Sequence, residues 1–205
     1  MQPIDILMTE HRVIEQVLSC LEKMSEQALR EEKLDCAAAK DAVGFFRFFA
    51  DRCHHAKEEA HLFPLLEAKG FSQENGPTGV MLYEHEQGRH HIRSMGEAIE
   101  PASLGDPAAC DRFVQHAQAY VELLRAHINK EDHCLFAMAN KVMTDADRAS
   151  LLESFVTVEH EEGEGSHEKY LQMADDLADR YGVPKVRRDT EYEHGDLCCR
   201  QHAKV

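Results

Sequence analysis

The chain contains two copies of one pattern, and this repeat restricts the fold more than any other feature. Residues 7–11 resemble residues 81–85, and residues 54–63 recur at 127–136. The first segment of each copy carries one histidine, and the second carries a histidine followed four residues later by a glutamate. Strong helix formers dominate, and Gly and Pro fall in clusters rather than at the spacing of strand turns. Two copies of a helix pair therefore predict four antiparallel helices.

Apolar periodicity gives the extent of each expected helix. We expect a fifth helix at the C-terminal side, loosened or kinked by the glycines at 163 and 165. The fold class is thus all-α: an antiparallel up-down four-helix bundle with an additional C-terminal fifth helix. The bundle domain would span residues 1–143, the packed helix 144–181 and a flexible tail 182–205. The expected helices cover residues 4–27, 35–69, 78–99, 107–142 and 144–181.

Six residues of the repeat indicate a metal site. Residues four apart on a helix point the same way, so each histidine of the second segments shares a face with its glutamate. The two histidines of the first segments lie on the apolar stripes of their helices. Buried carboxylates are tolerated when they are paired or bind a cation, and this donor set favours a pair of iron or manganese ions over a structural tetrahedral zinc. The expected ligands are His11, His54, Glu58, His85, His127 and Glu131.

On these residues the sequence resembles the hemerythrin-like, or HHE cation-binding, family. The ordered pattern His…His-x-x-x-Glu…His…His-x-x-x-Glu covers about residues 4–142. A Leu-Phe pair begins four residues after each glutamate, at Leu62-Phe63 and Leu135-Phe136. The resemblance implies an up-down four-helix bundle with a non-heme di-iron centre. Two Fe ions per chain would be bridged by the two carboxylates and by an oxo or hydroxo group, with Mn or Zn as alternative metals. Its partner would be a small oxidant: O2, NO or H2O2.

The third helix departs from the oxygen-carrier hemerythrins. Those proteins place a second histidine four residues after the third-helix ligand, where this chain has Arg89. Their last motif is His-x-x-x-x-Asp, and this chain offers both Glu131 and Asp132; we favour Glu131 because it repeats the register of Glu58. The site then has an extra open position or takes a ligand from elsewhere, which favours redox chemistry over oxygen carriage. Candidates for that ligand, or for residues beside the ligands, are His55, His61, Arg89, His90, His91, Asp132, Glu159, His160, Glu164 and His167.

Three functions stay open at this point. The chain would bind or sense a small oxidant, decompose peroxide as a di-iron enzyme, or store or regulate iron through a protein partner. The pairs Glu58/His61 and Glu164/His167 also have the Glu-x-x-His spacing of ferritin-like carboxylate proteins, which would move the metal toward the fifth helix.

Composition excludes other classes of partner. Lys and Arg total 23 against 38 Asp and Glu, giving a formal charge of −15, so the chain lacks the cationic footprint that nucleic acid requires. No apolar stretch approaches the roughly 20 residues that span a bilayer, and no secretory signal is visible. The seven cysteines are odd in number and scattered, which predicts no disulfide framework and a cytoplasmic location.

Several smaller signals have plain explanations. Cys53 and Cys134 lie close to expected ligands, but buried cysteine usually acts as a small hydrophobe. Gly88 lies one turn from His85, where it leaves room either for a small-ligand pocket or for close helix packing. The tail contains two histidines and two cysteines that would suit a soft metal, although chance placement is favoured: His194, Cys198, Cys199 and His202.

Overall fold

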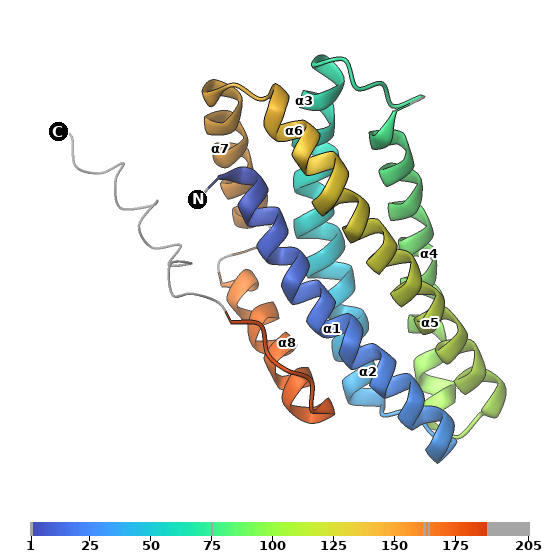
Figure 1. The fold of residues 1–205 in the computed structure, drawn as a ribbon. Coiled ribbons are helices and arrows are strands. Elements are labelled where there is room, and N and C mark those ends of the chain that lie inside the picture. The colour runs from blue at the N-terminus through green and yellow to red at the C-terminus, as the bar shows by residue number, and fades with distance from the viewer. Residues whose placement is uncertain (1, 75, 162, 164, 188–205) are drawn as a thin grey trace.

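The computed structural model describes residues 2–74, 76–161, 163 and 165–187, and every regular element in these ranges is a helix (Figure 1). This confirms the all-α prediction. The N-terminal part contains α1 (Pro3–Glu31), α2 (Cys36–Phe45), η1 (Phe46–His55), η2 (Glu58–Leu62) and α3 (Phe63–Ala68). The part that follows contains α4 (Pro77–Ser103), α5 (Pro107–Lys130), η3 (Glu131–Leu135), α6 (Phe136–Val142), α7 (Asp145–Glu161) and α8 (Ser166–Tyr181).

Several helices join end to end into longer helical runs, whereas α1 and α4 are each a run of one helix. From α2 to α3 the chain is one nearly continuous run, and so is the chain from α5 to α6. Figure 1 shows these two runs beside α1 and α4, and the axes of all four runs are roughly aligned while the chain alternates in direction from one run to the next. Side-chain caps start two of them: Asp35 accepts a hydrogen bond from the Ala38 N–H, and Asp106 accepts from the N–H groups of Ala108 and Ala109.

The segments η1, η2 and η3 are π-helical, whereas the periodicity predicted regular helix there. Each carries a residue of the expected site: His54 lies in η1, η2 begins at Glu58, and η3 begins at Glu131. Helical segments of this kind are rare and are frequently found at functional sites. Pro64 follows η2, but the equivalent position after η3 is Ala137, so proline is not their common cause.

The expected fifth helix is two helices, because the chain between α7 and α8 leaves the helical conformation instead of kinking. Gly163 and Gly165 have φ angles of +100° and +77°, which side chains rarely adopt. The second helix, α8, packs on α1, where the buried Gln16 amide donates to the Ala174 carbonyl at 2.9 Å. A smaller difference is that α4 continues through Pro101 to Ser103.

Two apolar clusters form the core. The larger joins α1, α2, η1, α4, α5 and α8, and the smaller lies where α3, α6 and α7 meet the start of α1. The expected ligands fall between the two clusters along each run: on α1, for example, His11 lies between Leu7 of the smaller cluster and Val13 of the larger. The site is therefore a polar layer inside an apolar interior.

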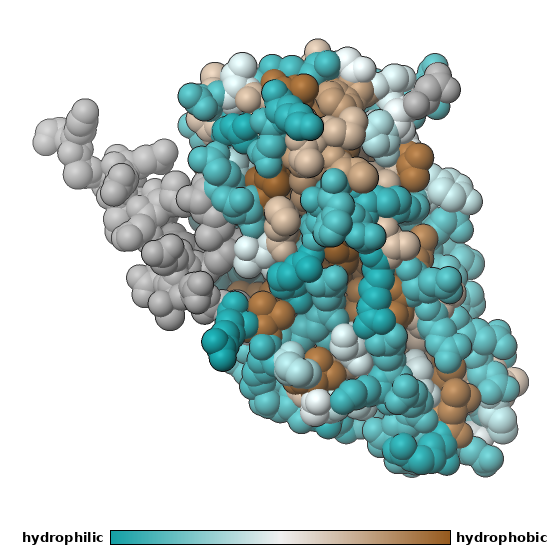
Figure 2. Space-filling model, in the orientation of Figure 1, coloured by the Kyte–Doolittle hydropathy of each residue, from teal (hydrophilic) through white to brown (hydrophobic). Residues whose placement is uncertain are grey.

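The face in Figure 2 is largely hydrophilic, with hydrophobic residues in small scattered groups. Within the described ranges no helix combines the length and apolarity needed to cross a bilayer.

Candidate metal centre

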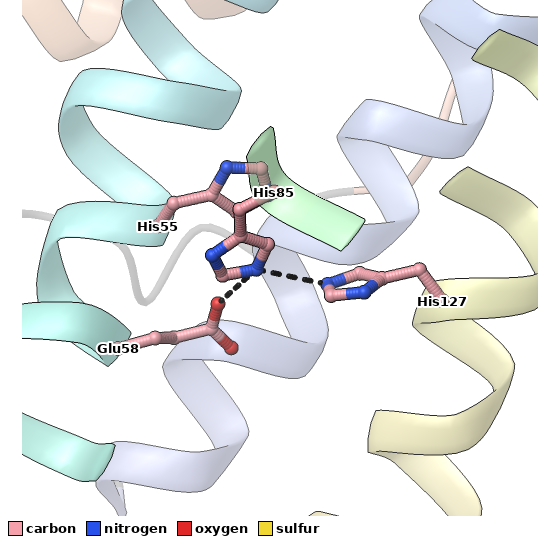
Figure 3. Close-up of side chains that lie close together, drawn as sticks. All are labelled: His55, Glu58, His85 and His127. Atoms are coloured by element: carbon pink, nitrogen blue, oxygen red, sulfur yellow. Dashed lines mark hydrogen bonds and ion pairs between the residues drawn. The ribbon is translucent and has the colours of Figure 1, made fainter. Parts of the chain in front are cut away.

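Seven buried residues from all four runs converge in the polar layer. They form two groups, and in each group one donor atom per residue lies within 4.8 Å of the others. Glu58 belongs to both groups. Figure 3 shows the first of them. Group A contains His55, Glu58, His85 and His127; group B contains His11, His54, Glu58 and Glu131.

The two carboxylates lie between the groups. Glu58 turns one oxygen to each side: Oε1 is 3.8 Å from His54 Nε2, and Oε2 is 3.6 Å from His85 Nε2. Glu131 Oε2 lies 3.3 Å from His11 Nε2 and 3.2 Å from His127 Nε2. Each glutamate thus faces one imidazole of each group, which is the placement that a bridging carboxylate requires.

Six inward atoms of this cluster have no hydrogen-bond partner among the described residues, whereas His85 Nε2 and His127 Nε2 lie 3.1 Å apart within hydrogen-bond distance. The six atoms are both oxygens of Glu58, both oxygens of Glu131, and Nε2 of His11 and of His54. A buried polar atom without a partner costs on the order of 1–3 kcal/mol, and more when it is charged. A cation between the groups would satisfy all of them, because imidazole nitrogens and carboxylate oxygens are metal ligands. The donor set therefore fits a pair of metal ions.

The pKa values of the two glutamates shift in opposite directions. Burial, together with the neighbouring Glu131, raises the pKa of Glu58 well above its usual value. Burial acts in the same sense on Glu131, but His127 and His11 outweigh it and hold the pKa of Glu131 well below its usual range. Burial also opposes the charge of His127, yet Glu131 and Glu84 raise its pKa to about 9. Burial and the neighbouring Glu131 thus favour the protonated form of Glu58, whereas the adjacent imidazoles stabilise the Glu131 carboxylate.

Four of the five histidines donate their outer nitrogen to a carboxylate. Such contacts fix the ring so that Nε2 points inward, and they raise the basicity of the ligand. The Nδ1–H groups donate as follows: His11 to Asp132 at 2.7 Å, His54 to Glu10 at 2.8 Å, His85 to Glu59 at 2.6 Å and His127 to Glu84 at 2.9 Å.

Two lysines support these carboxylates in the register of the repeat. Lys57 donates to Glu10, and Lys130 donates to Glu84. Lys57 is fully buried and also reaches Glu159 at 2.6 Å. Burial opposes its charge, but the two carboxylates raise the pKa of Lys57 above its usual value. It is therefore a buried cation held by two anions.

The sequence analysis included Asp132 and Glu159 among the candidates for residues beside the ligands, but it missed three glutamates and two lysines: Glu10, Glu59, Glu84, Lys57 and Lys130. The repeat does contain these residues. Glu10 precedes His11 as Glu84 precedes His85, and Lys57 and Lys130 occupy equivalent positions in the two copies. A glutamate beside a ligand on a helix points to a different face, so only the neighbouring helix reveals which histidine it contacts.

His55 is the candidate for a fifth imidazole ligand, because it belongs to group A. Its ring stacks on His85 with centroids 3.7 Å apart, and its equivalent in the second copy is the apolar Ile128. Group A therefore has three imidazoles and group B has two. Arg89, at the position where oxygen carriers have a ligand, instead contacts Asp51 at 2.8 Å and Glu59 at 2.7 Å.

The other candidate positions lie outside groups A and B. His61 lines a surface groove with Arg89, Glu159 contacts Lys57, and Asp132 contacts His11. Two more are histidines in separate groups: His167 lies with Glu10 and Cys53, and His90 lies with His91 and His116. His160 is an exposed residue of α7. Outside the described residues are Glu164, His194, Cys198, Cys199 and His202.

Gly88 makes room for a packed side chain. A Cβ atom at this position would lie 3.4 Å from Cε2 of Tyr120, whose buried ring also meets Phe46 edge-on at 4.9 Å. Close packing of α4 against α5 thus explains this glycine.

The fold and site define an all-helical protein built around a buried histidine–carboxylate cluster. Residues 2–139 match the family model described as the hemerythrin HHE cation binding domain, and the chain belongs to this family. This confirms the resemblance drawn from the repeat.

The curated relatives carry no assigned role. Uncharacterized proteins of Mycobacterium tuberculosis (strain H37Rv) and Mycobacterium bovis are each 25% identical over 178 residues, which cover 86% of this chain and 69% of theirs. These matches are longer than the family domain, so the similarity includes sequence beyond residue 139. No solved structure matches the chain significantly.

Proposed function

We propose that this chain is a non-heme di-iron protein that binds or senses a small oxidant: dioxygen, nitric oxide or peroxide. The observation that carries this proposal is the set of inward oxygens and nitrogens that lack partners around Glu58 and Glu131. Five imidazoles and two carboxylates suit iron, and manganese uses similar donors. When bound, iron would supply redox chemistry and a coordination position open to a diatomic ligand or peroxide.

The ligand assignment follows the two groups. His55, His85 and His127 would hold one ion, His11 and His54 would hold the other, and Glu58 and Glu131 would bridge them. Group B has one imidazole fewer, so we propose that the small oxidant binds on the side of His11 and His54.

The remaining residues of the layer orient the ligands and exclude water. The carboxylates keep a proton on each Nδ1, so that each Nε2 lone pair faces inward. Lys57 offsets the charge of the buried Glu10 and also contacts the partly exposed Glu159. The apolar clusters on both sides separate the layer from bulk solvent.

We also propose that the four runs form an up-down bundle domain over residues 1–143, with α7 and α8 as an addition that covers it. In support, α1 packs against α5 and α8, and α4 packs against α5. The ferritin-like alternative receives no support, because His61 lies outside both groups.

Titration of the iron-loaded, reduced protein with oxygen, nitric oxide and peroxide tests the function. A stable spectral change that saturates at about one ligand per pair of ions is the result we expect. Rapid peroxide turnover without a stable adduct would favour the enzymatic alternative. Iron-loaded protein that responds to none of the three would overturn the proposal.

A further inference from the structure

Three of the positions at which the two copies of the repeat differ lie together beside group A. Asp51 Oδ1 is 2.8 Å from Arg89 Nε and 3.5 Å from His55 Nδ1, so the three side chains are in contact in series. The equivalent positions carry two aliphatic residues and a glutamate, which cannot make these contacts. The pairs of equivalent residues are Asp51 and Leu124, His55 and Ile128, and Arg89 and Glu15.

The Arg89 guanidinium joins two carboxylates that face ligands of group A. Its Nη2 donates to Glu59 Oε1 at 2.7 Å, and the same oxygen accepts from His85 Nδ1 at 2.6 Å. Its Nε donates to Asp51 Oδ1, the oxygen that faces His55. Arg89 lies on α4, whereas both carboxylates come from the run that carries His55. A planar guanidinium presents donors in a fixed fork, so one side chain can hold both carboxylates at once.

Stacking alone does not direct two rings at one ion. His55 and His85 lie almost parallel, with centroids 3.7 Å apart (Figure 3). Contacts at the outer nitrogens fix such rings and point their inner nitrogens at the metal. The side chains that provide these contacts are 20% exposed for Asp51 and 27% exposed for Glu59, so each can turn toward water unless a cation holds it. We propose that Arg89 is a positioning residue for the group A ion. This inference rests on the two-ion site proposed above.

An ordinary surface ion pair does not account for these contacts. The one contact of that kind is with Glu86, which lies three residues away on the same helix and is 66% exposed. The nearest parallel in the molecule is Arg12, which contacts Asp132, the carboxylate that holds His11. Arg12 is 42% exposed and reaches one carboxylate that faces a ligand, whereas Arg89 is 27% exposed and reaches two.

Nitrogen-15 NMR of the histidine side chains in the metal-free, full-length protein tests the positioning without any metal. In the wild type, His85 should carry its proton on Nδ1. In Arg89→Gln it should become a mixture of tautomers, because Glu59 is no longer held against the ring. Arg93→Gln removes an exposed arginine one turn further along α4 and should match the wild type. Wild-type histidine signals in Arg89→Gln would overturn the proposal.

Competition of the iron-loaded protein with a chelator measures the consequence for the ion. Arg89→Gln should weaken the binding of one of the two ions about 10- to 100-fold and leave the other unchanged. In the His55→Ala background the same change should have a smaller effect, because one of the two rings that Arg89 holds is then missing. No loss of affinity, an equal loss in both backgrounds, or an equal loss in Arg93→Gln would overturn the proposal.

A second variant and the two readouts keep the test decisive. Arg89→Lys retains the charge but not the fork, so it should fall between the wild type and Arg89→Gln, and it replaces Arg89→Gln if that variant does not fold. Circular dichroism should be the same for all variants. Altered His85 signals in a protein that binds no iron would support the positioning role of Arg89 and contradict only the proposed function.

Discussion

Glu58 is the residue shared by both ligand groups, so its removal should affect both ions. We predict that Glu58→Ala lowers the bound metal to about one ion per chain or fewer and also lowers the melting temperature, because inward imidazoles lose a partner. Elemental analysis and thermal unfolding measure the two effects. Glu67→Ala, which removes an exposed glutamate of α3, should change neither. Full metal loading of Glu58→Ala would show that the ligand set is wrong.

His55 should act as the fifth imidazole ligand, at a position that lies one residue from His54. His55→Ala is expected to weaken binding of the group A ion at least about tenfold, since three imidazoles become two. His61→Ala is the matched control, because His61 lines the groove outside both groups. Competition with an iron chelator gives the affinities. Equal affinities in the two variants would remove His55 from the ligand set.

Lys57 and Lys130 occupy equivalent positions but differ in burial, which gives a matched pair. The side chain of Lys57 is 0% exposed and that of Lys130 is 41% exposed. Lys57→Met should reduce the free energy of unfolding by about 3–5 kcal/mol, because the buried charge of Glu10 loses its cation. Lys130→Met should cost about 1 kcal/mol or less. Denaturant unfolding measures the free energy lost in each variant. Equal losses in Lys57→Met and Lys130→Met would contradict this description of Lys57.

At the residue scale, the sequence predicts the cluster residues that lie in a spaced motif, but few of the side chains that contact them from outside. The four-residue spacing places each histidine and glutamate on one face, and the structure brings together all six of the residues expected from it. His55 was one candidate among many, because no spacing rule ranks a residue adjacent to a ligand. Its inward direction depends on the π-helical form of η1, which local sequence does not reveal.

The start of α7 is fixed by a reciprocal cap. The Thr144 N–H donates to Asp147 Oδ2 at 2.7 Å, the Asp147 N–H donates to Thr144 Oγ1, and Lys69 contacts the same carboxylate. Lys69 and then Thr144 lower the pKa of Asp147 to about 2. This carboxyl thus stabilises the fold above its ordinary pKa, and the stabilisation is lost as the pH falls through about 2.

We therefore predict that Asp147→Asn lowers the melting temperature by a few degrees at pH 7, and that the difference disappears near pH 2. Melting curves of the variant and wild type across this range measure it. Asp145→Asn removes an exposed carboxylate two residues away and should have a smaller effect that does not follow the same curve. A constant difference at all pH values would contradict the role of the Asp147 charge.

At the element scale, periodicity predicted the long helices well and their irregularities poorly. Apolar spacing extends unbroken through α4, so its length was found to within a few residues even though Pro101 lies inside the helix. The break between α7 and α8 needed the positive φ angles of Gly163 and Gly165, and a glycine alone permits such angles without requiring them.

At the scale of the whole molecule, the interior is a polar layer between two apolar clusters. Metal bound in that layer should therefore also stabilise the fold. Removal of metal by a chelator should lower the melting temperature, and added Fe²⁺ should restore it. Free iron at about 100 times its Kd would contribute about 2.7 kcal/mol, which corresponds to about 5–10 °C for a chain of this size. Glu58→Ala protein is the control and should respond much less. Identical melting curves with and without metal would show that the polar layer does not bind the metal.

Metal content per chain tests the central claim most directly. The measurement is elemental analysis of protein purified without oxygen and without added metal, after growth in iron-replete medium. We predict about two iron ions per chain, since two ligand groups share Glu58. A single zinc ion, or no metal at all, would contradict the di-iron assignment.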